Sequence, residues 1–191
     1  MALVNKNHAI TCSSREWADY LQNEVIAPLA ADVGFGEQML EVGPGPGAAT
    51  DWLRHQVDRL VAVESDEAAA AKLAERFAGT NVEIVHGDAT ALRFPDGAFD
   101  AAGSFTMLHH VPTVAEQDQV LAEAVRVLRP GGVLVGSDSL ASDRLREFHE
   151  GDVYNPVDPD RLREVLEGLG CTAVEVKAAK VVTFTARKPE L

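Results

Sequence analysis

The chain has 191 residues, of which 46% are hydrophobic, and this length and apolar content predict one domain with a single core. It carries 17 Lys and Arg against 30 Asp and Glu, which gives a formal charge of −13 at pH 7. The charge disfavours nucleic acid and anionic membranes as partners, because both would repel a negative surface.

The first predicted element is an amphipathic helix over residues 13–30. Ser13 and Glu16 have the spacing of a capping box, the pattern that opens many helices. Apolar side chains then recur at helical intervals, at Trp17, Tyr20, Leu21, Val25 and Leu29. These intervals predict one buried face, and a kink is expected at Pro28.

Short apolar strands then alternate with helices. The expected strands are residues 39–42, 60–63, 82–85, 99–102 and 133–136. Ser65 or Asp66 is expected to cap one of the helices, and a capping box of Thr113 and Glu116 to open another. Pro130-Gly131-Gly132 should end the latter helix. Because such alternation builds βαβ units, the sequence predicts an α/β fold with a doubly wound, mostly parallel sheet.

The last part of the chain departs from this alternation. A helix is predicted from Asp158-Pro159 to about Leu169, followed by alternating runs at 172–176 and 181–186. Only a few residues separate the two runs, so they predict an antiparallel hairpin at the edge of the sheet. Residues 138–157 show no strong periodicity.

A glycine-rich loop follows the first predicted strand and reads Glu41-Val42-Gly43-Pro44-Gly45-Pro46-Gly47. In a doubly wound sheet, ligands bind beyond the carboxyl ends of the strands, close to this position. Glu64 closes the second strand, where an acidic side chain can accept hydrogen bonds from ribose hydroxyls. The loop and Glu64 together predict a ligand that contains adenosine.

The loop residues favour a cationic ligand over a pyrophosphate. Pro44 and Pro46 each remove a backbone N–H that could bind an anion. Glu41 places a carboxylate at the mouth of the loop, and no Lys or Arg follows it until Arg54. A dinucleotide is therefore the less suitable ligand.

The loop resembles the first motif of the class I S-adenosylmethionine-dependent methyltransferases. The resemblance continues in order at Glu64, Gly87-Asp88-Ala89, the strand from Phe99 to Ser104, and Leu128-Arg129-Pro130-Gly131-Gly132. It implies a Rossmann-like sheet of seven strands, with the last strand antiparallel between the fifth and the sixth. It also implies S-adenosyl-L-methionine as cofactor and S-adenosyl-L-homocysteine as product, with the methyl group transferred by direct in-line displacement.

The resemblance assigns a cofactor site. Glu41 would face the ammonium group, Glu64 the ribose and Asp88 the adenine amino group, while the loop glycines would let the cofactor approach the backbone. The alternative for Asp88 is a simple turn, a position that Asp favours. The implied cofactor-binding residues are Glu41, Gly43, Gly45, Gly47, Glu64, Asp88, Ala89 and Ser104.

His109 and His110 are the candidate catalytic residues. A histidine with an ordinary pKa could deprotonate an acceptor hydroxyl or amine at neutral pH, although a structural or cofactor-lining role is the alternative. Adjacent histidines do not make a metal site alone, because neighbouring positions rarely converge on one ion without help from elsewhere. Cys12 and Cys171 form no CxxC pair either, so we expect no bound metal and no disulfide.

The predicted domain has four parts. Residues 1–36 form a helical lead-in or lid, 37–137 the cofactor-binding core, 138–157 a possible substrate lid, and 158–191 the C-terminal helix and hairpin. Candidate substrate contacts, for each of which a solvated surface position is the alternative, are Trp17, Tyr20, His149 and Tyr154.

The acceptor class is narrowed by the end of the fourth strand, which reads Ser104-Phe105-Thr106-Met107. Methyltransferases of nucleobase amines or of glutamine usually carry Asn or Asp, two prolines and an aromatic residue at this position, so those acceptors are disfavoured. Residues 105–111 instead resemble the branch that includes quinone, sterol and natural-product methyltransferases. This resemblance implies a small-molecule acceptor without naming it.

Two other functions remain open. An NAD(P)-dependent oxidoreductase shares the fold and the acidic residue on the ribose, but Tyr20 and Tyr154 do not stand in a Tyr-x-x-x-Lys pattern. A methyltransferase-like subunit could also bind the cofactor without turnover. Release of S-adenosyl-L-homocysteine would distinguish an enzyme from such a subunit.

The expected location of the protein follows from segments that the sequence lacks. No apolar run approaches the roughly 18 to 20 residues that a membrane span needs. The first eight residues do not have the basic and apolar regions of a secretion signal. We therefore expect a cytoplasmic protein that acts on a small molecule and binds neither nucleic acid nor membranes. Whether it is a monomer or a homodimer stays open.

Overall fold

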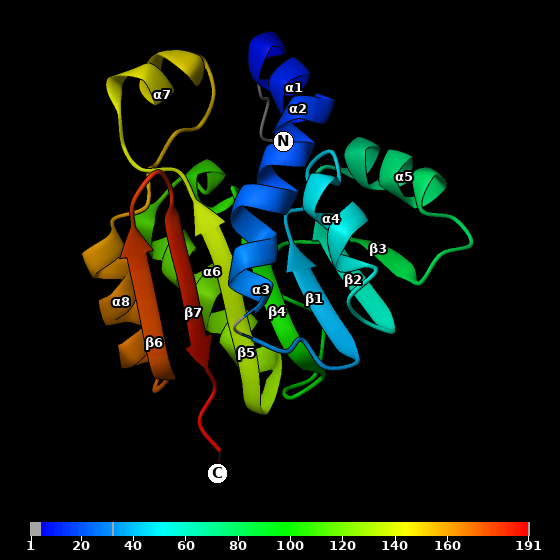
Figure 1. The fold of residues 1–191 in the computed structure, drawn as a ribbon, viewed down its shortest axis with the longest axis vertical. Coiled ribbons are helices and arrows are strands. Elements are labelled where there is room, and N and C mark those ends of the chain that lie inside the picture. Colours follow the sequence, from blue (N-terminus) through cyan, green and yellow to red (C-terminus); the bar gives the residue numbers. More distant parts are fainter. Residues whose placement is uncertain (1–4, 32, 191) are drawn as a thin grey trace.

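The computed structural model describes residues 5–31 and 33–190. Its centre is a seven-stranded sheet in the order β3-β2-β1-β4-β5-β7-β6 (Figure 1). The predicted doubly wound sheet is confirmed, because β1 to β5 run parallel and β7 lies antiparallel between β5 and β6. The strands are β1 (Gln38–Val42), β2 (Arg59–Glu64), β3 (Val82–His86), β4 (Phe99–Phe105), β5 (Leu128–Asp138), β6 (Thr172–Ala178) and β7 (Val182–Arg187).

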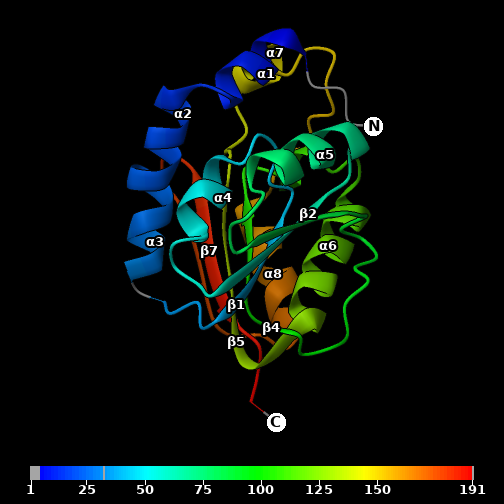
Figure 2. The ribbon, with the colours of Figure 1, turned by 90° about the vertical axis from the view of Figure 1, so that its right-hand side faces the viewer.

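Helices cover both faces of the sheet. Figure 2 shows α3 (Ala27–Ala31) and α4 (Ala48–Leu53) on one side, with α6 (Val114–Val127) and α8 (Pro159–Gly168) on the other. α5 (Glu67–Arg76) packs against β2 and β3. None of the helices in the described parts of the chain has the length and apolar character that crossing a membrane requires.

The two faces have separate apolar cores, to which successive residues of β1 contribute in turn. Leu40 and Val42 pack with side chains of α6 and α8, whereas Met39 packs with the N-terminal helices and α4. Successive side chains of a strand point to opposite faces. Because both faces are buried, the strands have the continuous apolar runs that the sequence showed.

Several helices begin where the sequence predicted. At the start of α6, the Thr113 hydroxyl accepts a hydrogen bond from the Glu116 N–H at 3.2 Å, and the Glu116 carboxylate accepts one from the Thr113 N–H at 3.0 Å. Asp66 caps α5 and Asp158 caps α8 with their side-chain oxygens. These caps are local interactions, which is why the sequence alone revealed them.

The N-terminal segment differs from the single predicted helix. It contains α1 (Lys6–Cys12), α2 (Arg15–Tyr20), a π-helical turn (Leu21–Ile26) and then α3. The expected cap at Ser13 is wrong by one residue: Ser13 ends α1, and the hydroxyl of Ser14 accepts from the Trp17 N–H at 3.2 Å. The π-helical turn, which is wider than a turn of α-helix, lies just before Pro28. Proline has no N–H to donate to this turn.

Two further boundaries differ from the predictions. β5 begins at Leu128, so Pro130-Gly131-Gly132 lies inside the strand, at a shift in its pairing with β4. Residues 138–157 contain a short helix, α7 (Asp143–Phe148), which the side chain of Ser142 caps. Only six residues long, α7 has too few turns to show a periodic apolar pattern in the sequence.

Two helices lie above the carboxyl ends of the parallel strands. Figure 1 shows α1 and α7 above the carboxyl ends of the parallel strands. The two helices are tied together by Asn5, whose side-chain amide donates to the Phe148 carbonyl at 2.8 Å. The His8 ring and Asp152 also contact each other, with 2.9 Å between Nδ1 and Oδ2. Segments about 145 positions apart thus form a roof over the strand ends.

Candidate functional site

A cavity of about 890 Å³ lies at the carboxyl ends of the parallel strands. The loops after β1 to β4 line it, and α1, α2 and α5 contribute side chains to its rim. Trp17 and His110 are among the lining residues. The predicted cofactor residues that line it are Glu41, Gly43, Gly45, Glu64, Asp88 and Ala89.

The glycine loop forms one wall of the cavity. Its glycines have positive φ angles, +68° at Gly43 and +51° at Gly45, which other residues rarely adopt. A Cβ added to Gly45 would meet no atom within 4 Å, so the backbone at this residue faces open space. A ligand can therefore come into contact with the main chain there.

Glu64, at the end of β2, connects the second strand to the loop. One carboxylate oxygen accepts a hydrogen bond from the Gly45 N–H at 3.3 Å, and the other accepts from the Asp66 N–H at 2.9 Å. Glu64 therefore holds the loop as well as lining the cavity. The sequence predicted its place at the strand end but not its bond to Gly45.

Glu41 lies in β1 and is almost completely buried, with 1% of its surface exposed. The Thr50 hydroxyl, in α4, donates to its carboxylate at 2.7 Å. Desolvation by burial raises the pKa of Glu41 to about 7, although the Thr50 hydrogen bond lowers it in part. A cation bound in the cavity would favour the charged form of this carboxylate.

Asp88 and Ala89 follow β3 and lie in the cavity wall. The Asp88 Oδ1 accepts from the N–H and the hydroxyl of Thr90, at 2.8 and 2.7 Å. Asp88 therefore forms the turn that its residue type favours and at the same time presents a carboxylate to the cavity. The two readings of Asp88 are compatible.

Three other predicted residues do not reach the cavity. Gly47 caps α4 and faces α5, where an added Cβ would lie 3.0 Å from the Leu73 side chain. Ser104 is buried in β4, and Tyr20 packs with the apolar core and with Trp17, whose ring centroid is 5.8 Å away. The glycine at position 47 thus allows close packing of helices, and the three residues are not brought to the ligand space.

The two candidate catalytic histidines have different surroundings. Both belong to a 3₁₀ turn, Leu108–His110, after β4. The His109 Nδ1 lies 2.7 Å from the Asp138 carboxylate in the interior, whereas His110 lines the cavity. Burial, followed by the neighbouring histidines, lowers the pKa of His110 to about 3. The expectation of an ordinary pKa is therefore wrong for His110, which is neutral at physiological pH.

His149 and Tyr154 lie behind His110 instead of in the cavity wall. Their rings stack with centroids 4.6 Å apart. His149 is only 3% exposed, so the alternative of a solvated surface position is wrong for it. His8, which the sequence analysis did not single out, lies beside both His110 and His149.

The charge of the cavity is mostly negative. Two basic residues of α5, Lys72 and Arg76, also line it. Both lie far from the glycine loop in the chain, so the loop sequence gave no sign of them. Arg76 forms an ion pair with Asp51 and donates to the Pro46 carbonyl. Five carboxylates outnumber these two basic groups, and they belong to Glu41, Glu64, Asp66, Asp88 and Glu116.

Comparison with known proteins shows the family to which the chain belongs. Residues 40–136 match the model of a family described as a methyltransferase domain. A probable S-adenosylmethionine-dependent methyltransferase of Mycolicibacterium smegmatis is 32% identical over 118 residues, which are 62% of this chain and 44% of that protein. A demethylmenaquinone methyltransferase of Clavibacter sepedonicus is 36% identical over 111 residues, 58% of this chain and 42% of that protein.

The solved structures show the same fold. The crystal structure of a SAM-dependent methyltransferase from Aquifex aeolicus matches with a TM-score of 0.75 at 17% identity, covering 97% of this chain and 100% of that one. At this identity the match concerns the architecture alone. The chain spans less than half the length of the two curated relatives.

Proposed function

Because the chain belongs to the methyltransferase domain family, we propose that it transfers a methyl group from S-adenosyl-L-methionine to a small-molecule acceptor. The observation that carries the proposal is the open space over Gly45, opposite the carboxylate of Glu64, in a cavity where acidic groups outnumber basic ones. A ligand with a sulfonium and an ammonium group suits this charge, whereas a pyrophosphate does not.

The cofactor roles are distributed over the first three strand ends. Glu64 binds the ribose hydroxyls, and Asp88 with the Ala89 N–H binds the adenine. Glu41 balances the ammonium group, directly or through water. The arrangement supports these roles because all four residues line one cavity.

The chain's own contribution to the reaction is alignment and exclusion of water. When bound, S-adenosyl-L-methionine supplies a methyl group that is already activated on a sulfonium. The protein therefore needs to hold the acceptor in line with the methyl group, which α1, α2 and the segment after β4 do from the rim of the cavity. Residues 1–36 and 138–157 act as lids in this proposal.

The acceptor side of the cavity is largely apolar and aromatic. Trp17, Phe105 and Met107 line the cavity, and His8, His110 and Thr106 are among its polar groups. Apolar walls with a few polar groups are typical of small-ligand sites. With a formal charge of −13, the chain gains little from contact with a polyanion, which supports a small acceptor over a nucleic acid.

The proposal is tested by incubation with radiolabelled S-adenosyl-L-methionine and a cell extract, followed by separation of the label by size. We expect label in the small-molecule fraction and release of S-adenosyl-L-homocysteine. Label mainly in RNA, DNA or protein would contradict the acceptor class. Binding of NAD, measured by calorimetry, with no response to S-adenosyl-L-methionine would support the oxidoreductase, and cofactor binding without any product would support the non-catalytic subunit.

We predict that cofactor affinity rises with pH through Glu41. Since the pKa of Glu41 is about 7, only a minor part of this group is ionised at pH 6 and most of it at pH 7.5. The affinity should therefore increase by roughly five- to tenfold over this range, because the ammonium group binds the ionised form. Calorimetric titrations at several pH values measure it.

Glu41→Gln provides the control, because glutamine can still accept the Thr50 hydrogen bond. It should remove this pH dependence and bind the cofactor weakly throughout. Without cofactor, the raised pKa makes unfolding easier as the pH rises from about 4.5 to 7, since the unfolded chain loses the proton first. Glu41→Gln should therefore unfold at a higher temperature than the wild type at pH 7.5. An unchanged pH profile in the variant would assign the effect to another group.

A further inference from the structure

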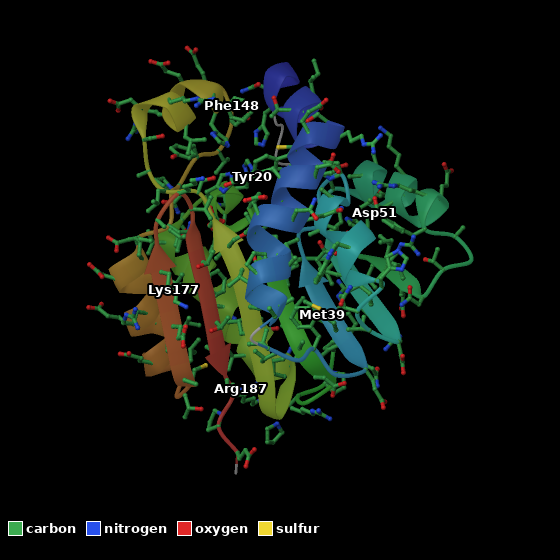
Figure 3. All side chains as sticks on the ribbon, viewed as in Figure 1. Tyr20, Met39, Asp51, Phe148, Lys177 and Arg187 are labelled. Atoms are coloured by element: carbon green, nitrogen blue, oxygen red, sulfur yellow. The ribbon has the colours of Figure 1, made fainter. Side chains whose placement is uncertain are left out.

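Three histidine side chains from separate segments meet at the roof of the cavity. His8 comes from α1, His110 from the turn after β4, and His149 from the end of α7. Their ring centroids lie 4.6 to 5.4 Å apart, and one nitrogen from each ring lies within 4.8 Å of the others. Figure 3 shows Phe148 on the side of α7 toward α1, where its ring lies 5.1 Å from that of His8.

Each ring is held by the protein through one nitrogen. The His8 Nδ1 contacts the Asp152 carboxylate at 2.9 Å, and the His149 Nδ1 contacts the Leu145 carbonyl at 2.7 Å. His110 forms a hydrogen bond with the backbone of Val153. These contacts fix the orientation of the three rings.

Two of the three rings have a second nitrogen that lacks a hydrogen-bond partner. Within the described residues, the Nδ1 of His110 and the Nε2 of His149 are buried and have no hydrogen-bond partner. Buried polar atoms of this kind are rare in native proteins and call for an explanation such as an ion. The neutral imidazole is the form that binds metals.

We propose that His8, His110 and His149 bind a divalent transition metal ion, with zinc as the best-suited ion. Zinc is bound by imidazole nitrogens at about 2.0–2.1 Å, which brings the nitrogens of a tetrahedral site to within roughly 3.4 Å of one another. The nitrogens lie within 4.8 Å of one another here, so binding an ion would draw the three rings closer together. Asp152 and the Leu145 carbonyl occupy the positions of the outer acceptors that orient metal-bound histidines.

The number of ligands indicates the kind of site. Three protein ligands and one open position are typical of catalytic zinc, whereas structural zinc has four protein ligands. His8 and His110 also line the cavity, so the open position is accessible to a ligand there. His110 can be a metal ligand only if side chains from other segments join it, and His8 and His149 do so. His109 is not included because the nitrogens that meet within 4.8 Å belong to His8, His110 and His149.

Metal binding is tested on the full chain after treatment with a chelator, by titration with Zn²⁺ in a calorimeter and with Co²⁺ in a spectrophotometer. We expect one ion per chain and the intense visible absorption of four-coordinate Co²⁺. His110→Gln and His149→Gln should each weaken binding at least 100-fold, while the exposed His55→Ala should bind as the wild type does. Asp152→Asn should weaken it by about 10- to 100-fold, since Asp152 only positions His8.

Folding of each variant is checked by circular dichroism, and its affinity for S-adenosyl-L-methionine is measured in the same samples. The metal site is independent of the proposed function, so it stands if the ion binds and no methyl transfer is found. Stoichiometric binding that survives both His110→Gln and His149→Gln would overturn it. So would the absence of Zn²⁺ and Co²⁺ binding by the folded wild type.

Discussion

Gly45→Val should abolish binding of S-adenosyl-L-methionine while the chain still folds. An added Cβ at Gly45 meets no protein atom within 4 Å, so the valine side chain would extend into the space that the ligand needs. The positive φ of Gly45 adds backbone strain for a β-branched residue. Isothermal calorimetry should detect no binding at millimolar cofactor, a loss of about 1,000-fold for a micromolar ligand.

The matched control for this variant is Gly79→Val. Gly79 has φ +76°, an added Cβ there also meets no atom within 4 Å, and it does not line the cavity. Its backbone strain is therefore similar, but its side chain cannot reach the ligand. Gly79→Val should lose some thermal stability and retain wild-type affinity. If both variants lost binding equally, strain and not steric exclusion would be the cause.

Glu64→Ala should weaken cofactor binding by about 2 kcal/mol, or roughly 30-fold. The carboxylate loses its charge-assisted bonds to the ribose hydroxyls, and the Gly45 N–H loses its acceptor. The loop should consequently become less ordered before the ligand binds. Titration calorimetry measures the affinity, and hydrogen exchange at the Gly45 amide reports the ordering of the loop.

Glu67→Ala is the control for Glu64→Ala. Glu67 is an exposed carboxylate three positions further along, in the first turn of α5, and it does not line the cavity. Removing it changes the net charge by the same amount as removing Glu64. An equal loss of affinity in both variants would mean that the ligand responds to overall charge and that Glu64 does not bind the ribose.

Much of the fold could be predicted because its signals are local. The strands β1 and β2 are apolar runs of strand length, and the capping box of α6 and the caps of α5 and α8 involve residues two or three positions apart. The predicted boundary of a strand was wrong where the local sequence suggested a different structure. Pro130-Gly131-Gly132 suggests a turn, yet it lies inside β5, where the pairing with β4 passes from Leu128 to Val133 and skips these residues.

That three acidic residues would line one cavity was predictable for a related reason. In a parallel sheet the carboxyl ends meet at one edge, so Glu41, Glu64 and Asp88 could be placed together from their positions at strand ends. The meeting of the histidines at the roof of the cavity could not be predicted in this way. His8 reaches His149 only because α1 packs against α7, and no sequence pattern links two segments 141 positions apart.

The position of β7 between β5 and β6 also has a consequence for synthesis of the chain. β6 leaves the ribosome first, but in the finished sheet its strand partner is β7. Until residue 187 has emerged, β5 keeps an open edge and β6 has no partner. Open edges recruit strands from other molecules, and incomplete nascent sheets are prone to aggregation. Completion of the sheet therefore depends on its last strand, and a chain that stops short of β7 exposes the open edge of β5.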